Sequence, residues 1–171
     1  MLRGQDILIL AGLLGATDAR VTIQSVADEV GLDLASVHRG LARLSEARLI
    51  TPERRVALAQ ADEFLAHGLQ YVFPPRFRGE SRGVATAWGA PPLRALLTET
   101  GSPVPVWAHP EGDTRGIALD PVHPAIPDAA LRNAQLYERL ALVDALRAGD
   151  ARVRQLARDE LMKRLSVAAS P

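Results

Sequence analysis

Two amphipathic segments separated by a gap of only three residues constrain the fold of this chain more than any other feature. Residues 23–30 and 34–47 both carry apolar side chains at helical spacing. Two helices joined by so short a gap must cross at a tight turn. Ala27 provides the small side chain that a close crossing needs, and Gly31 tolerates the positive φ of the turn. The spacing therefore predicts a helix-turn-helix.

The flanking sequence predicts the elements of a winged helix. Residues 2–15 have the periodicity of a preceding helix, and residues 48–50 and 56–58 have the composition of two short strands. Thr51 to Arg55 would connect these strands, with Arg54 and Arg55 in the turn. A further helix is expected over residues 59–71, before the prolines at 74 and 75.

The second helix of the pair has one apolar and one polar face. Val37, Leu41 and Leu44 recur at helical spacing and are expected to face the core. Polar side chains able to contact phosphates or base edges in a major groove occupy the remaining face. These are Ser36, His38, Arg39 and Arg43.

The alternative is that these arginines form surface ion pairs and that the domain binds protein. Asp33 and Glu46 are the acidic partners available to Arg39 and Arg43, and residues 1–60 contain seven basic and seven acidic side chains. Winged-helix domains also serve as protein-binding modules. We favour DNA binding, because the basic residues of the second helix share its exposed face.

The stretch VADEVGLDLASVHRGLARLSEARLI resembles the MarR-like and related bacterial winged-helix regulators, and the resemblance covers residues 1 to about 72. It implies a transcriptional regulator that binds double-stranded DNA through a recognition helix at about 34–47. By this resemblance Ser36, His38, Arg39 and Arg43 would be recognition-helix contacts. Arg54 and Arg55 would be wing contacts to the DNA backbone or minor groove.

The middle of the chain has weaker patterns. Residues 76–103 lack clear periodicity, apart from a short helix expected near 93–98. Arg76, Arg78 and Arg82 are expected in a solvated linker, with a phosphate-binding or partner-binding loop as the alternative. Residues 104–108 and 116–119 suggest a hairpin. Pro103 and Pro105 would make its first strand an edge strand.

Neither a catalytic nor a metal site is expected. Trp88 and Trp107 are more typical of a core than of a ligand pocket. His109, Glu111, Asp113 and His123 match no standard metal-site spacing. No arrangement of a nucleophile with a base, or of paired carboxylates, stands out. We therefore expect no enzyme activity and no cofactor.

Two helices with apolar faces are expected at the end, over residues 128–147 and from about 150 to 165. They could pack within the chain, form a dimer interface or dock a partner. We favour a homodimer, since DNA readers of this class usually dimerise. RGIALDP followed by LYERLALVDALRAGDARVRQLA resembles the C-terminal halves of bacterial winged-helix proteins similar to antitoxins. That resemblance implies an alternative function, in which an antitoxin-like or scaffold protein binds a partner protein.

The whole chain is thus expected to be mainly α with short β-hairpins, an α+β fold. We expect a winged helix-turn-helix over residues 1–73 and a C-terminal interaction region over 74–171. A net charge of zero does not exclude DNA binding, because recognition depends on where the charges lie. The absence of cysteine excludes disulfides and thiolate metal sites. No apolar run of about 18 residues and no secretory pattern at the start are present, so a cytoplasmic protein without a membrane span is expected.

Overall fold

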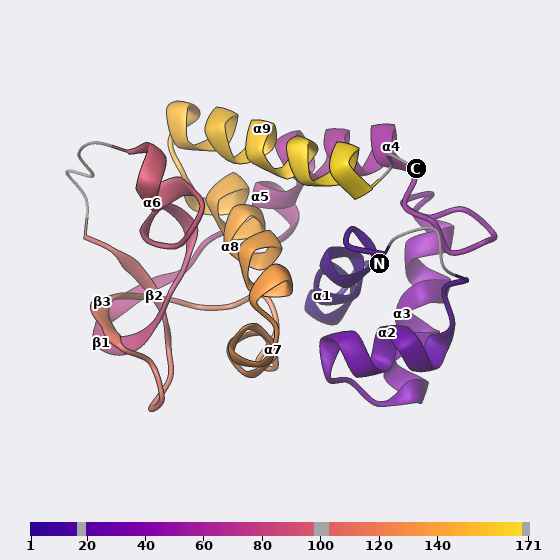
Figure 1. Ribbon diagram of the computed structural model, residues 1–171, viewed down its shortest axis with the longest axis horizontal. Helices are drawn as coiled ribbons and strands as arrows, with labels where there is room; N and C mark the ends of the chain where they lie inside the picture. Colours follow the sequence, from indigo (N-terminus) through magenta and orange to yellow (C-terminus); the bar gives the residue numbers. More distant parts are fainter. Residues whose placement is uncertain (17–19, 98–102, 169–171) are drawn as a thin grey trace.

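The computed structural model describes residues 1–16, 20–97 and 103–168, except for the side chains of 166–168. The chain has a mainly helical α+β fold with one three-stranded sheet. Figure 1 shows α1, α2 and α3 at one end, the sheet at the other, and α8 between them. The elements are α1 (Gly4–Leu13), α2 (Ile23–Val30), α3 (Leu34–Glu46), α4 (Leu58–Glu63), η1 (Phe64–Gly68), α5 (Leu69–Val72), β1 (Phe77–Ala85), η2 (Ala87–Gly89), α6 (Leu93–Leu96), β2 (Pro105–Ala108), β3 (Thr114–Leu119), α7 (Ile126–Arg132), α8 (Ala134–Ala148) and α9 (Ala151–Ala168).

Helix α1 is enclosed by its neighbouring helices. Every residue from Asp6 to Leu13 is buried, because the helix contacts α2, α3 and α8 on different sides. Such burial suits its sequence, which is apolar on all faces from Ile7 to Leu13. The Asp6 carboxylate accepts a hydrogen bond from the backbone amide of Arg3 at 2.8 Å, which caps the first turn.

Helices α2 and α3 and the glycine between them occur where the spacing predicts. Thr22 caps α2 by accepting the amide of Ser25 at 3.0 Å. Gly31 adopts the left-handed conformation with φ 69°, and its amide donates to Ala27 at 2.8 Å. Asp33 then caps α3. The chain therefore reverses within three residues and packs both helices on α1.

The two short strands expected after α3 are reduced to one bridge between Ile50 and Val56. Backbone bonds from Thr51 to Arg55 and from Ala57 to Leu49 hold the ends of the connecting turn together. We call residues 51–55 the wing turn. Since α4 already begins at Leu58, no room remains for a longer second strand.

The sheet differs from the expected hairpin. Strands β2 and β3 are parallel, with Pro105 opposite Ile117, and β1 is antiparallel to both. The three strands close on one another, so β2 is not an edge strand. β1 also replaces the linker expected at Arg76 to Arg82. Its first six residues are mostly exposed, so their sequence lacks the alternation that signals a strand.

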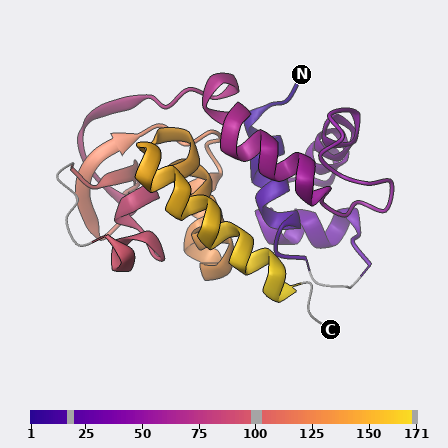
Figure 2. The same cartoon turned by 90° about the horizontal axis from the view of Figure 1, so that it is seen from above.

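The expected helix over residues 128–147 is divided at Asn133, which ends α7 and caps α8 by accepting the Leu136 amide at 3.0 Å. Helix α8 is buried along most of its length between the sheet and α1. Helix α9 lies beside α4 and α5 (Figures 1 and 2), where Arg158 forms an ion pair with Asp62 at 2.6 Å.

One hydrophobic cluster joins both halves of the chain. It includes Leu10 of α1, Val37 of α3, Trp107 of β2, Leu142 of α8 and Leu161 of α9. The cluster therefore crosses the boundary at residue 73, and the division into two domains stays a prediction. Of the helices in the described part of the chain, none is both long and apolar enough to cross a membrane.

Candidate nucleic-acid interface

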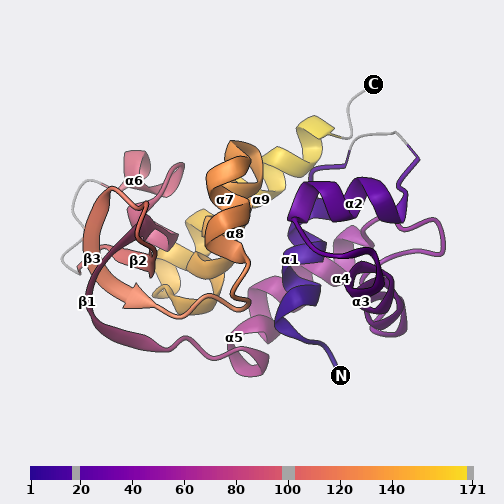
Figure 3. The ribbon, with the colours of Figure 1, turned by 90° about the horizontal axis from the view of Figure 1, so that it is seen from below.

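Helix α3 presents one continuous face to solvent. Val37, Gly40, Leu41 and Leu44 are buried against the core. Figures 1 and 3 place the helix and the wing turn at the end of the molecule farthest from the sheet. The residues exposed on the opposite side are Leu34, Ala35, His38, Arg39, Ala42, Ser45 and Glu46.

His38 and Arg39 are the two nitrogen-bearing side chains at the middle of this face. Both are exposed. The Arg39 guanidinium donates to the Ser36 hydroxyl at 3.3 Å, one turn earlier on the same helix. The guanidinium therefore lies along the helix surface, where it can still donate to a phosphate or to a guanine edge.

Ser36 is only partly exposed, and its backbone and side chain serve the first turn of α3. Its amide donates to the Asp33 carboxylate at 2.8 Å, and its carbonyl accepts from the Gln5 side chain at 3.1 Å. Hydrogen bonds from the side chain and then the amide of Ser36 lower the pKa of Asp33. Ser36 thus orients Arg39 and Asp33 and contributes little surface of its own.

Arg43 differs most from the sequence prediction. Its guanidinium turns toward α1 and forms two hydrogen bonds with Asp6, at 2.8 and 2.7 Å. Its side chain is 15% exposed and that of Asp6 is fully buried. The bond to Asp6 raises the pKa of Arg43. Arg43 therefore joins α3 to α1, and neither Glu46 nor Asp33 is its partner in this ion pair.

The wing turn lies next to α3 and is held in place by Arg54. This residue has a positive φ of 62°, and its guanidinium donates to the Val21 carbonyl at 3.1 Å, just before α2. Arg55 is exposed in the same turn. Arg48, also exposed and with φ 59°, lies between α3 and the bridge.

The sequence interpretation missed the exposed apolar residues of α3 and Arg48. Leu34 is 50% exposed. Ala35 and Ala42 are exposed beside His38 and Arg39. A helical projection would have found Ala35 and Ala42 opposite Val37, Leu41 and Leu44, whereas Leu34 lies at the edge of the apolar side and Arg48 lies beyond the end of α3.

Glu46 and Glu53 limit the positive charge of this end of the molecule. Glu46 is exposed at the last turn of α3 and Glu53 in the wing turn. The basic side chains of the α3 face, His38 and Arg39, therefore lie at its middle, between the exposed acids Asp33 at the N-cap and Glu46 at the last turn. Contact with a polyanion would be strongest near His38 and Arg39.

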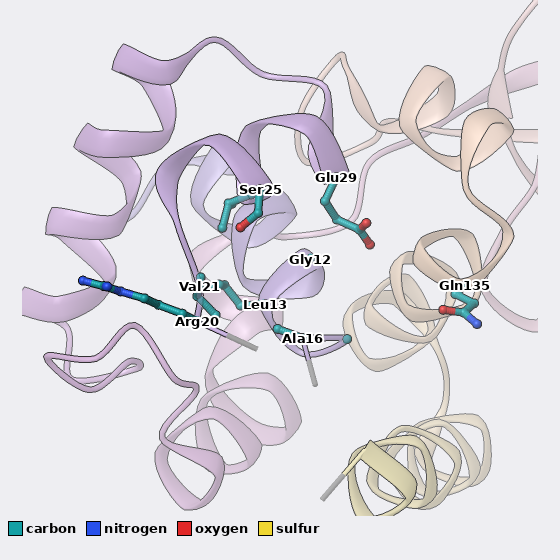
Figure 4. Close-up of a pocket in the computed structure, with 10 residues that line it drawn as sticks. Gly12, Leu13, Ala16, Arg20, Val21, Ser25, Glu29 and Gln135 are labelled. Carbon is teal, nitrogen blue, oxygen red and sulfur yellow. The ribbon is translucent and has the colours of Figure 1, made fainter. Parts of the chain in front are cut away.

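A pocket of about 270 Å³ lies between the end of α1, helix α2 and the start of α8 (Figure 4). Leu13 and Val26 provide apolar walls, while Ser25, Glu29 and Gln135 provide polar ones. The lining residues come from α1, α2, α8 and the segment before α2. The pocket is thus separate from the exposed face of α3.

The buried polar groups around the two tryptophans bond to one another and stabilise the fold. The Asp144 carboxylate accepts from Trp107 at 2.7 Å, from Thr86 at 3.0 Å and from Arg147 at 2.8 Å. Trp107 is therefore a core residue, as expected. Trp88 is partly buried, and its indole donates to the Pro103 carbonyl at 3.4 Å.

The basic residues of the predicted linker lie in or next to β1, and the histidines considered as metal ligands bond to neighbouring protein groups. Arg76 directly precedes β1, Arg78 pairs with Asp120 at 2.6 Å, and Arg82 is exposed on the strand.

His109 contacts Asp128 at 3.0 Å, and its other ring nitrogen accepts the Glu111 amide. His123 accepts the Ala125 amide at 3.2 Å. Within the described ranges no cluster of three or more His, Asp or Glu residues is placed to hold a metal ion.

Comparison of the chain with models of protein families, with curated proteins and with solved structures found no match.

Proposed function

We propose that the chain binds double-stranded DNA by inserting α3 into the major groove, and that it acts as a transcriptional regulator of the winged helix-turn-helix class. One observation carries this proposal. A helix fixed to the core on one side presents His38 and Arg39 together on its other side, at an end of the molecule. A major groove about 12 Å wide admits such a helix.

The small residues of α3 support a close approach. Ala35 and Ala42 are exposed on the same side as Arg39, so the backbone of α3 can lie near the base edges. In this proposal the wing turn beside the helix contacts the DNA backbone through Arg55, and Arg54 holds the turn in place by its bond to Val21 and adds its remaining donors. Ser36 and Arg43 act indirectly in this proposal, by orienting Arg39 and by fixing α3 on α1.

A homodimer belongs to the proposal. A monomer would place one α3 in one groove, whereas a twofold pair could place two at half-sites about 34 Å apart. The alternative, an antitoxin-like protein or scaffold, has less support. Most of α8 is buried within the chain, so α9 provides the larger free surface of the C-terminal helices.

Fluorescence anisotropy with the full chain tests the proposal. The duplex would be the DNA upstream of the protein's own coding sequence, measured at about 50 and 200 mM salt. We expect Arg39→Ala to weaken binding roughly fivefold or more and to lower the salt slope by about one. Arg152→Ala is the matched control, because Arg152 is an exposed arginine on α9.

Two results would contradict the proposal. No binding to this duplex or to a mixed genomic pool at low salt would end the proposal. Equal loss of affinity in Arg39→Ala and Arg152→Ala would show that binding is only a general charge effect.

A further inference from the structure

We propose that α3 selects duplexes in which thymines flank a single G·C pair in each half-site. This inference rests on the proposed function and adds the bases that the helix prefers. It follows from the exposed side chains of α3, which include three apolar groups and one arginine.

The apolar groups are the first part of the argument. Leu34 is 50% exposed at the first turn of α3, and Ala35 follows it in solvent. Ala42 is exposed two turns after Ala35. In the major groove only thymine presents a methyl group, and apolar side chains are the groups that contact it. DNA with thymines opposite Leu34 and Ala35 would remove these carbons from water.

The polar groups are the second part. Arg39 is the one arginine on the exposed side of α3 within the described residues, because Arg43 is bound to Asp6. An arginine fork matches the O6 and N7 acceptors of guanine. The Ser36 hydroxyl holds this fork along the helix at 3.3 Å. One guanidinium allows one bidentate guanine contact, with His38 as an additional neighbouring donor.

The positions of these groups give an order along the helix. Leu34 and Ala35 lie one turn before His38 and Arg39, and Ala42 lies one turn after them. A helix turn rises 5.4 Å, which exceeds the 3.4 Å spacing of base pairs on one strand. Methyl contacts would therefore fall on both sides of the guanine. The acidic Glu46 at the end of the face would keep the remaining turn away from phosphates.

Base analogues test this inference directly. The full chain would first enrich binders from a library of random duplexes. In the enriched duplex each thymine is then replaced by uracil, which removes only the methyl, and the guanine by 7-deazaguanine, which removes N7. We expect roughly fourfold weaker binding for each uracil that lies under α3, and roughly fivefold or greater loss for 7-deazaguanine.

Leu34→Ala assigns the effect to α3. One uracil position should lose its effect in this variant, while affinity for a duplex without thymine methyls stays the same. Leu96→Ala is the matched control, because Leu96 is 46% exposed on α6, which lies at the sheet end of the molecule, far from α3 (Figure 1). It should retain the sensitivity of the wild type to every uracil.

Three results would overturn the inference. One is an enriched duplex without thymines, and another is a set of uracil effects all below about twofold, which is less than one buried methyl is worth. The third is equal weakening of all duplexes by Leu34→Ala. In these cases the protein still binds DNA and the proposed function stands. Failure to enrich any duplex would instead overturn both.

Discussion

Arg43 and Asp6 form the ion pair that fixes α3 on α1. Asp6 is fully buried, and its carboxylate also accepts the Arg3 amide. Removal of one partner from a buried pair leaves an uncompensated charge, which destabilises strongly. We therefore expect Arg43→Ala to lower the free energy of unfolding by about 3 kcal/mol. Urea denaturation followed by circular dichroism measures this change.

Arg39→Ala is the matched control for that measurement. Arg39 is exposed on the same helix, and among the described residues its side chain bonds to Ser36 alone, so its loss should change stability by less than about 0.5 kcal/mol. Comparing the two variants shows whether Arg43 stabilises the fold or contacts DNA. An Arg43→Ala protein with wild-type stability and no affinity for DNA would restore Arg43 as a contact residue.

His123 makes stability depend on pH. Burial lowers the pKa of His123, and its ring accepts the Ala125 amide, which requires an unprotonated nitrogen. The unfolded chain therefore binds this proton more readily than the folded one. The contribution of the neutral His123 ring to the stability of the fold is therefore complete above about pH 6.5 and is lost as the pH falls below it. Between pH 7.5 and 5.5, the midpoint temperature of thermal unfolding should therefore fall less steeply in His123→Gln than in the wild type.

A steeper or unchanged pH dependence in His123→Gln would contradict this account. His67→Gln is the comparison, since His67 is an exposed histidine in η1. Its replacement should leave the wild-type pH dependence in place.

At the scale of elements, the turn between α2 and α3 depends on Gly31. A side chain in the left-handed conformation costs roughly 1–2 kcal/mol. A Cβ on Gly31 would also meet the end of the Arg132 side chain, which would have to move. Gly31→Ala should therefore lower the free energy of unfolding by about 1 kcal/mol or more. Gly79→Ala is the control in the same denaturation assay, because an added Cβ there would meet no atom within 4 Å beyond its chain neighbours.

The local elements could be predicted from the sequence and the long-range pairings could not. Ala27, Gly31 and Asp33 act within their own turns, so their spacing is sufficient to place α2 and α3. Strand β1 was missed because residues 77–82 are largely exposed and show no alternation. The parallel pairing of β2 with β3 depends on β1 and could not be inferred without it.

The candidate site shows the same division. His38 and Arg39 were predicted on the exposed face, because Val37 and Leu41 define the opposite side of the same helix. The partner of Arg43 lies 37 residues away on α1. No pattern within α3 distinguishes an arginine that points to solvent from one that reaches a distant carboxylate.

At the scale of the whole molecule, α8 connects the two ends. Near its start, Arg139 donates to the Ala11 carbonyl at 2.8 Å and to Glu29 at 3.0 Å. Near its end, Arg147 donates to the Asp120 carbonyl at 2.8 Å, beyond β3. These bonds lie within or beside the one hydrophobic cluster. Any motion of α1 or α2 relative to the sheet would therefore have to disturb α8.

This connection predicts that the chain unfolds in a single transition. Trp88 and Trp107 both lie after residue 73, so tryptophan fluorescence reports on the C-terminal part alone. Circular dichroism reports on helices of both parts. Because the core is continuous across residue 73, the two thermal transitions should coincide. Arg139→Met, which leaves Glu29 without this partner, should lower both midpoints together. A fluorescence midpoint that stays unchanged while the helical signal melts earlier would instead establish residues 1–73 as an independent domain.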